Sequence, residues 1–285
     1  MSSNPWLKRR TLCYAHQGGA WEAPSSTLHA IARAIDLGAP AIELDVHMTA
    51  DGELVVCHDE TVDRTTAASG EICTLTLAEL RELDNAYWWI AGADVTPGRS
   101  ADAYPFRGEA PANRSFGIAT LREVLELAPS TFLNFDIKRT APEVEPYEPQ
   151  LAAMLAEFGR RDDVIVASFN DDAVDRFKAV APEVHTAAGT RRTAEFYFAV
   201  QEGKLPEHID YVALQVPEAY EDITLVDEAF VAAAHGAGVA VHVWTINDEP
   251  SMQRLLDLGV DGIITDVPAV CLDLLSRRGL GWRAN

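Results

Sequence analysis

The feature that most restricts the fold of this chain is an alternation of short apolar runs with amphipathic segments. Eight runs rich in apolar or β-branched residues predict strands at Leu12–Ala15, Ala41–Val46, Thr131–Ile137, Val164–Ser168, Val184–Ala188, Asp210–Leu214, Val239–Thr245 and Asp261–Thr265. Helical spacing lies between most of them, at Thr27–Leu37, Tyr147–Phe158, Asp171–Val180, Val226–His235, Pro250–Leu258 and Pro268–Leu275. Strands that alternate with helices predict a parallel sheet. Eight such units predict an α/β fold of the closed (β/α)8 TIM-barrel type.

An open, doubly wound sheet is the structural alternative to the barrel. The loop after the first predicted strand reads His16-Gln17-Gly18-Gly19 and lacks a Gly-x-Gly-x-x-Gly run, so it does not favour dinucleotide binding. A length of 285 residues suits one α/β barrel. We therefore expect a single domain over residues 1–285.

One region interrupts the alternation. After the second predicted strand, Asp51-Gly52 predicts a turn and Glu53–Cys57 a returning strand, which together make a hairpin. A long connection follows, and we place an insertion at about residues 85–119, since connections of this length are usually lids or small subdomains. Its aromatic residues predict either a small core for the insertion or a pocket wall for a choline group or an acyl chain, and they are Tyr87, Trp88, Trp89, Tyr104 and Phe106.

Charge and composition exclude several classes of partner. The chain has 44 acidic and 23 basic residues, a net charge of -21, which repels nucleic acids and anionic membranes. No apolar run is long enough for a membrane span, so we expect no integral membrane segment. The basic run Lys8-Arg9-Arg10 is followed by too short an apolar stretch for a secretory signal. The four cysteines show no Cys-x-x-Cys spacing and are expected to be buried apolar residues in a cytoplasmic protein.

Acidic side chains gather where the second and third predicted strands end. Glu43 and Asp45 are two residues apart and share one face of a strand, as do Asn134, Asp136 and Lys138. In a barrel that face is the interior mouth, where function collects. Carboxylates that converge there repel one another unless a cation joins them, and oxygen ligands favour Mg²⁺ or Ca²⁺. The alternative is that Glu43 and Asp45 are solvent-facing strand residues.

Two histidines accompany these acids. His16 ends the first predicted strand and His58 ends the hairpin. Two imidazoles beside a divalent ion suit phosphoryl transfer, because one removes a proton from the nucleophile and the other protonates the leaving oxygen. Lys138 is either an ion-pair partner of the acids or a phosphate clamp. The remaining histidines are assigned structural roles, and they are His29, His47, His185, His208, His235 and His242.

Motifs in the same order along nearly the whole chain resemble the glycerophosphodiester phosphodiesterase family, in particular its bacterial cytoplasmic and lysophospholipase D-like members. Each motif alone is weakly specific, and the set is highly specific. The matching segments are Ala15–Gly19, Ala39–Met48, Thr49–Gly52, Val55–Thr66, Thr120–Leu125, Asn134–Lys138, Val243–Asp248 and Leu258–Asp266.

This resemblance implies a TIM-barrel hydrolase that converts glycerophosphodiesters to glycerol 3-phosphate and an alcohol. It implies Glu43, Asp45 and Asp136 as ligands of one Mg²⁺ or Ca²⁺ ion, and His16 and His58 as the acid and base. It also implies a substrate-binding role for three further residues, Gln17, Lys138 and Trp244.

The chain departs from the family pattern at three positions. Asp136 stands where family members commonly have Glu. Gln17 replaces an Arg, and an amide cannot offer phosphate a bidentate cation. Ser25 replaces a Glu, for which Glu22 is a partial substitute. The last two changes remove one charge of each sign, so we hypothesise that Gln17 and Ser25 form a paired exchange that adapts the site to a changed substrate.

Other functions remain open at this stage. The chain is also similar to a lysophospholipase D acting on lysophospholipids, and the negative charge favours a substrate with a cationic group such as choline. A phospholipase D-type toxin acting on sphingomyelin would need a secretion signal and a disulfide. The loss of the Arg and the Glu also permits a non-catalytic barrel that binds phosphodiesters. Turnover in the presence of Mg²⁺ or Ca²⁺ separates these readings.

Overall fold

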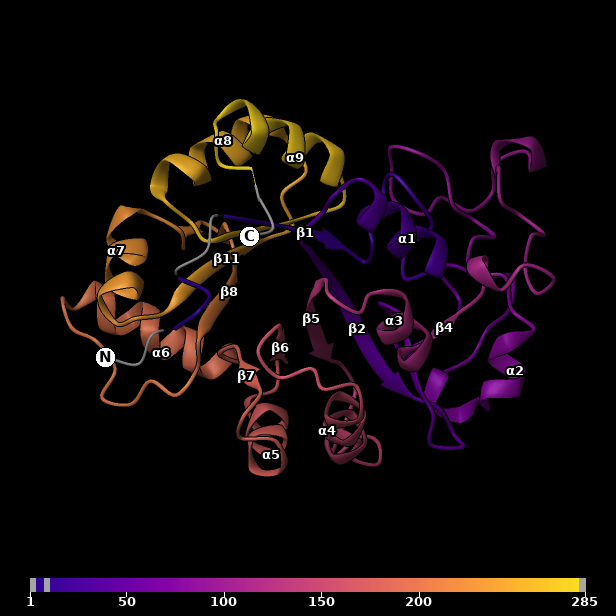
Figure 1. Ribbon diagram of the computed structural model, residues 1–285, viewed down its shortest axis with the longest axis horizontal. Coiled ribbons are helices and arrows are strands. Elements are labelled where there is room, and N and C mark those ends of the chain that lie inside the picture. Colours follow the sequence, from indigo (N-terminus) through magenta and orange to yellow (C-terminus); the bar gives the residue numbers. More distant parts are fainter. Residues whose placement is uncertain (1–3, 8–10, 282–285) are drawn as a thin grey trace.

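Eight parallel strands form the barrel that the sequence predicts (Figure 1). The computed structural model describes residues 4–7 and 11–281, so the basic run at 8–10 lies outside the described residues. The neighbours run β7-β6-β5-β2-β1-β12-β11-β8, and one parallel bridge from Ala187 to Ala213 joins the two ends into a ring. The strands are β1 (Leu12–His16), β2 (Ala41–Met48), β5 (Phe132–Ile137), β6 (Val164–Ala167), β7 (His185–Thr186), β8 (Ala213–Pro217), β11 (Ala240–Trp244) and β12 (Gly262–Thr265).

Helices cover the outside of this ring, with α4 and α5, α6 and α7, and α8 and α9 as successive neighbours (Figure 1). The six helices predicted from the sequence are confirmed to within one or two residues at each end. The helices are α1 (Leu28–Asp36), α2 (Leu77–Arg81), α3 (Leu121–Leu127), α4 (Glu148–Glu157), α5 (Asp171–Val180), α6 (Thr190–Gln201), α7 (Glu228–Gly236), α8 (Glu249–Leu258) and α9 (Pro268–Arg277).

Several elements differ from the prediction. Helices α2 and α3 were not predicted, and two further differences affect the site. The sixth strand was expected at Asp210–Leu214, but β8 runs from Ala213 to Pro217, since Asp210 lies outside the strand and is paired with Lys178. Helix α6 was not predicted at all. Only Phe196 of this helix is buried. The helix therefore lacks the repeating apolar positions of a helix that packs one face on a core, which are the signal used to predict the other helices.

The hairpin after β2 is confirmed, and the insertion follows it. Strand β3 (Leu54–Val56) pairs antiparallel with β2 and with the short β4 (Ala119–Thr120). Between β3 and β4 lie α2 and three short 3₁₀ helices, η1 (Ile72–Thr74), η2 (Ala101–Ala103) and η3 (Arg114–Phe116). Figure 1 shows this region beside α1 and α2, on the side of the molecule opposite α6 and α7.

The aromatic residues of the insertion form its own core. The Arg107 guanidinium lies 3.8 to 4.5 Å from the ring centres of Tyr87, Trp88 and Tyr104, so it occupies the cation site that these rings make. Phe106 stacks on Phe116 with ring centres 4.8 Å apart. The structural interpretation of these aromatic residues is therefore correct. None of them is among the described residues that line the cavity at the carboxyl ends of the barrel strands.

The core has an inner and an outer part. Inside the barrel, Trp6 packs with strand residues such as Leu12, Tyr14 and Ile264, which close the bottom of the ring. Outside, the opposite face of each strand packs on the helices, and Ile42, Leu44 and Val46 belong to this layer. The alternation leaves Glu43 and Asp45 on the inner face, so the solvent-facing alternative for these two acids is wrong.

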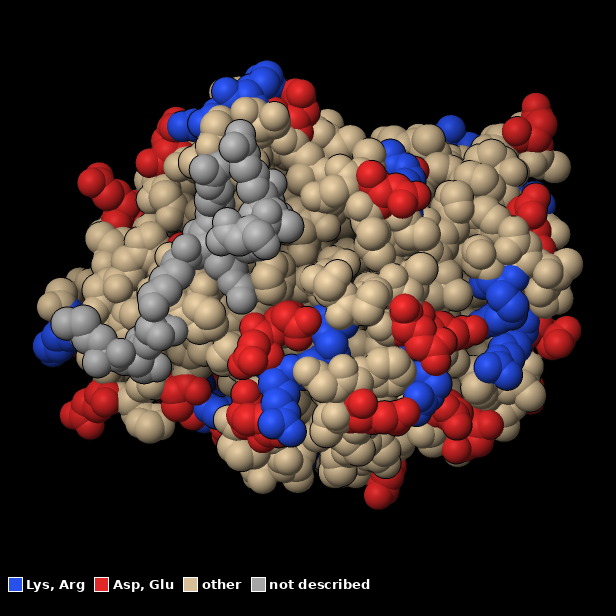
Figure 2. Space-filling view, in the orientation of Figure 1, with Lys and Arg blue, Asp and Glu red and all other residues tan. Residues whose placement is uncertain are grey.

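The surface and the cysteines carry little further information about function. Figure 2 shows acidic and basic side chains side by side over one face, without a continuous region of one sign. Three cysteines are buried as expected, whereas Cys73 is half-buried and donates to Glu71. Within the described residues, no helix has the length and apolarity needed to cross a membrane.

Candidate active site

The registers of β1, β2 and β5 bring the predicted site residues together. His16 on β1 is aligned with Glu43 on β2, and Asp45 on β2 is aligned with Asp136 on β5. Two consecutive inward positions of β2 therefore each have a polar neighbour on an adjacent strand. We call His16, Glu43, Asp45, His58, Asp136 and Lys138 the charged arc, and all six line one cavity at the carboxyl ends of the strands.

The acids of the charged arc are buried around a single cation. Lys138 Nζ lies 2.8 Å from an oxygen of Asp45 and 2.9 Å from an oxygen of Asp136. Burial raises the pKa of Glu43, and the nearby Asp45 raises it further. Burial also raises the pKa of Asp136. For Lys138, burial lowers the pKa, but Asp45 and Asp136 outweigh that effect and raise it, so Lys138 stays charged.

Each histidine of the charged arc is oriented by a carboxylate. His16 Nδ1 lies 2.6 Å from Asp266, whose second oxygen accepts from the Asn247 amide at 2.7 Å. His58 Nδ1 lies 2.6 Å from Asp59, whose second oxygen accepts from Arg64 at 2.7 Å. A carboxylate on Nδ1 holds the proton there, which leaves Nε2 as the nitrogen available to a substrate.

The two imidazoles face one another across the site. Their ring centres are 5.9 Å apart and their planes nearly perpendicular. The His16 side chain is 17% exposed and that of His58 is 37% exposed, so His16 lies deeper and His58 nearer the mouth.

The turn after His16 needs its glycines, because a Cβ at Gly18 would lie 2.7 Å from the Ala30 side chain.

The opposite side of the cavity is apolar. Its wall is built by the loop after β6, by α6 and by the hairpin of β9 (Ala219–Tyr220) and β10 (Ile223–Thr224). We call the large apolar residues of this wall the apolar arc, and they are Phe169, Tyr197, Phe198, Tyr220, Ile223 and Leu225. The cavity volume is about 660 Å³, within the range of pockets that hold drug-sized ligands.

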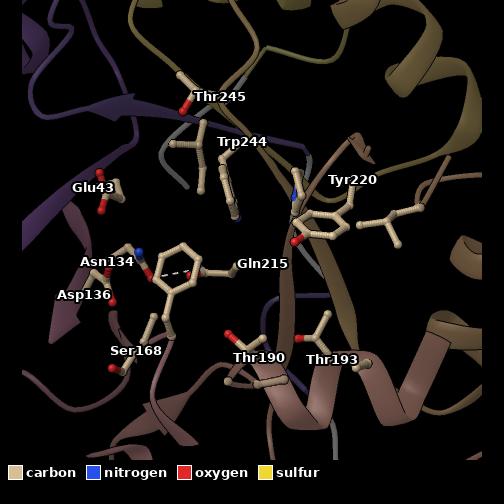
Figure 3. A pocket seen from close by; sticks show the side chains of 18 of the residues that line it. Glu43, Asn134, Asp136, Ser168, Thr190, Thr193, Gln215, Tyr220, Trp244 and Thr245 are labelled. Carbon is tan, nitrogen blue, oxygen red and sulfur yellow. Dashed lines mark hydrogen bonds between the residues drawn. The ribbon is translucent and has the colours of Figure 1, made fainter. Parts of the chain in front are cut away.

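Figure 3 shows how the two arcs face each other. Glu43 and Asp136 lie on one side, and Thr190, Thr193 and Tyr220 on the other, with Trp244 and Gln215 between them. The predicted substrate residue Trp244 therefore stands where the arcs meet. Gln215 donates to Asn134 at 2.8 Å and lies 3.4 Å from His242 below, which forms a polar floor.

Two of the family departures have a clear structural setting. The Gln17 amide nitrogen lies 3.1 Å from His16 Nε2, the nitrogen that the Asp266 contact leaves free to accept, so Gln17 must release it before a substrate can use it. Gln17 is not among the described residues that line the cavity. Glu22 was expected to substitute for the carboxylate missing at Ser25. That expectation is wrong, since Glu22 is bound to Arg33 at 2.6 Å and to the Ala269 backbone at 3.1 Å.

The donor set of the charged arc fits a hard divalent cation. One oxygen each of Glu43, Asp45 and Asp136 is buried and has no hydrogen-bond partner. Such oxygens are the preferred ligands of Mg²⁺ and Ca²⁺. In the part of the chain that the structure describes, no three His, Cys, Asp or Glu side chains already have the arrangement of metal ligands, and Lys138 holds the second oxygen of Asp45 and of Asp136.

Sequence reasoning missed the residues that support the site. Asp266 and Asn247 lie within motifs of the family resemblance, but their contacts with His16 depend on the closure of β12 onto β1. The apolar arc was missed because α6 and the β9–β10 hairpin were not predicted.

Comparisons of sequence and of fold show which known proteins this chain resembles. A sequence model of the glycerophosphoryl diester phosphodiesterase family matches residues 16–270. A glycerophosphodiester phosphodiesterase of Caldanaerobacter subterraneus is 33% identical over 95% of this chain and 100% of its own length. The crystal structure of a putative glycerophosphoryl diester phosphodiesterase from Silicibacter pomeroyi covers 99% of both chains, with a TM-score of 0.74 and 22% identity. An Oleispira antarctica phosphodiesterase, solved with the product sn-glycerol-3-phosphate, covers 94% of this chain and 97% of its own, with a TM-score of 0.69 and 25% identity.

Proposed function

The chain belongs to the glycerophosphoryl diester phosphodiesterase family of phosphoric diester hydrolases, and from that premise we propose that it hydrolyses glycerophosphodiesters to glycerol 3-phosphate and an alcohol by paired histidine chemistry. The observation that carries the proposal is the pair of histidines 5.9 Å apart, each with Nδ1 on a carboxylate, beside three buried acids. Two histidines oriented in this way suit general acid and base catalysis better than binding alone.

The deeper histidine acts first in the proposed reaction. The glycerol hydroxyl next to the phosphate displaces the Gln17 amide from His16 Nε2 and gives its proton to that nitrogen, and the hydroxyl oxygen attacks phosphorus. The bond from phosphorus to the alcohol oxygen breaks. His58 lies nearer the mouth, enters this step with a proton on both ring nitrogens, and gives the Nε2 proton to the departing oxygen. A cyclic phosphate and the free alcohol result.

Water completes the reaction with the roles reversed. His58 now takes a proton from water, whose oxygen bonds to phosphorus, and His16 returns its proton to the ring oxygen that leaves. The net change is the addition of one water across the phosphorus–oxygen bond. Lys138 offers positive charge to the phosphoryl oxygens, at the point where negative charge develops.

A divalent ion completes the proposed site. Glu43, Asp45 and Asp136 would hold Mg²⁺ or Ca²⁺ through the oxygens that have no hydrogen-bond partner. When bound, such an ion polarises a phosphoryl oxygen and neutralises the acids.

A release assay tests the proposal. Purified protein is treated with a chelator, and glycerol 3-phosphate is measured from glycerophosphocholine after Mg²⁺ or Ca²⁺ is restored. We expect no release with the chelator and release with an ion. Phosphodiester binding without release under any ion would favour the non-catalytic barrel and contradict the proposal.

A further inference from the structure

The apolar arc is more exposed to water than a core would be. Phe198 and Tyr220 are each 62% exposed and Phe169 is 59% exposed, and these are the three highest values among the large exposed apolar residues of the described chain. All three line the same cavity. Large apolar side chains gathered on one surface mark a place where another apolar group binds.

The helix and the hairpin that carry this surface expose most of their apolar residues to the cavity or to solvent. In α6 only Phe196 is buried, while Tyr197 and Phe198 face the cavity side. The β9–β10 hairpin has all four of its residues exposed, and its Tyr220 and Ile223 line the cavity. The hairpin therefore contributes a wall rather than a core.

The apolar side of the cavity offers no charged side chain to an anion. Outside the charged arc, the described lining residues include no Asp, Glu, Lys, Arg or His. The first turn of α6 is not an anion site either, since Asp171 already accepts from the backbone amides of Arg191 at 2.8 Å and Arg192 at 3.2 Å. A phosphate therefore has one place to bind, beside Lys138.

The two arcs are continuous. The Phe169 ring centre lies 5.7 Å from Lys138 Nζ, so a group that follows the phosphate away from Lys138 meets Phe169 first. A glycerol phosphate fills only the charged end of a cavity of about 660 Å³. The rest of the volume is lined mainly by apolar residues of α6, of the hairpin and of the loop after β6.

We propose that the diester cleaved here carries a single hydrocarbon chain, which lies along the apolar arc while its phosphate sits in the charged arc. This rests on the proposed function, because it names the substrate class of the same site. Two kinds of diester share this chemistry. In a lysophospholipid the chain is on the glycerol, and in a glycerophosphoalkanol it is on the released alcohol.

The test compares kcat/KM for a series of substrates below their micelle concentrations. Glycerophosphocholine has no chain, lysophosphatidylcholines carry chains of increasing length on the glycerol, and glycerophosphoalkanols carry them on the alcohol. We expect kcat/KM to rise with chain length in one series, by up to about fourfold for each methylene that is buried. The series that rises identifies which side of the phosphate holds the chain.

Two variants locate the chain. Phe198→Ser and Tyr220→Ser should each lower the ratio of kcat/KM for the chain-bearing substrate to that for glycerophosphocholine by about tenfold, the loss expected when one large apolar contact is removed. Val180→Ser is the matched control, since Val180 is 49% exposed and does not line the cavity. It should leave the ratio unchanged.

A flat dependence on chain length in both series, with ratios unaffected by Phe198→Ser, would overturn the inference while the proposed function stands. If no diester is hydrolysed, the proposed function fails. The binding of dodecylphosphocholine, measured by calorimetry, then tests separately whether the apolar arc binds a hydrocarbon chain. Binding that Phe198→Ser weakens at least fivefold supports the apolar site, and binding that is absent or insensitive to this variant overturns it.

Discussion

The charged arc and the apolar arc share one cavity but are held in different ways. The acids of the charged arc are at most 7% exposed, and each is fixed by strand register and by ion pairs or hydrogen bonds. The apolar arc stands on a helix, a hairpin and a loop, and its residues include side chains 59 to 62% exposed. Reaction chemistry needs fixed atoms, whereas an apolar chain needs only a surface of sufficient area.

We infer from this difference that the charged arc determines the reaction rate and the apolar arc the substrate preference. A change in the charged arc should lower the rate for every diester, because every diester presents the same phosphate. A change in the apolar arc should alter which diester is preferred. The predictions below test this division, beginning with the largest effect.

Removal of either histidine should nearly abolish turnover. We expect His16→Ala and His58→Ala each to lower kcat by about 100- to 10,000-fold for every substrate, the usual contribution of a general acid or base. Product release and thermal melting are measured together. His208→Ala is the control, because its side chain is 82% exposed and remote from the cavity. Unchanged turnover in a folded His16→Ala or His58→Ala protein would show that this histidine is not the general acid or base.

Asp266 should act as a positioning residue for His16. Asp266→Asn preserves the shape of the side chain but no longer holds the proton on His16 Nδ1, so we expect kcat/KM to fall on the order of 100-fold. The pH dependence of kcat/KM should change as well, and Asp266→Ala should be no less impaired. A loss of activity that merely follows a loss of folded protein, with an unaltered pH profile, would assign Asp266 a structural role.

The floor beneath both arcs should make stability depend on pH. Burial lowers the pKa of His242 to about 3 from its ordinary value near 6.5. Between these values the unfolded chain binds a proton that the folded chain does not, so stability falls as the pH is lowered through that window. This one group contributes a slope of up to about 1.4 kcal/mol per pH unit. Denaturant unfolding of His242→Gln between pH 4 and 7 should show a shallower slope than the wild type, whereas an equal slope would contradict the assignment.

The paired exchange at Gln17 and Ser25 should have the smallest effect. Gln17 lies against His16, so an Arg there places a cation beside the imidazole without the acid that family members have at position 25. We expect Gln17→Arg alone not to raise the turnover of glycerophosphocholine. The double variant Gln17→Arg/Ser25→Glu should turn over this substrate faster than Gln17→Arg alone. Higher turnover from either single change would refute the pairing.

The charged arc could be predicted from the sequence and the apolar arc could not. Side chains alternate between the two faces of a strand, and this local rule predicts that Glu43, Asp45 and Asp136 point into the barrel. The register of β2 and β5 agrees with that prediction. The strand and helix pattern likewise predicted the barrel, but it did not mark α2, α3 or α6, and it placed the start of β8 three residues early. The single domain, the cytoplasmic location and the identity of the ion stay predictions.

The apolar arc has no such local signal. Phe198 and Tyr220 are exposed apolar residues on elements that do not bury a face, so neither helical nor strand periodicity marks them. The partners of the histidines are also non-local, since Asp266 meets His16 across 250 positions of the chain. Asp59 next to His58 is the exception, and adjacency in the sequence was the signal that could have found it.

One measurement tests the division between the two arcs most directly. It is the ratio of kcat/KM for a chain-bearing diester, taken from the series in which kcat/KM rises with chain length, to that for glycerophosphocholine. The ratio is determined for the wild type, for Asp136→Asn and for Phe198→Ser. We predict that Asp136→Asn lowers both rates and leaves the ratio within about twofold, while Phe198→Ser lowers the ratio about tenfold. A ratio that changes with Asp136→Asn and not with Phe198→Ser would contradict the account.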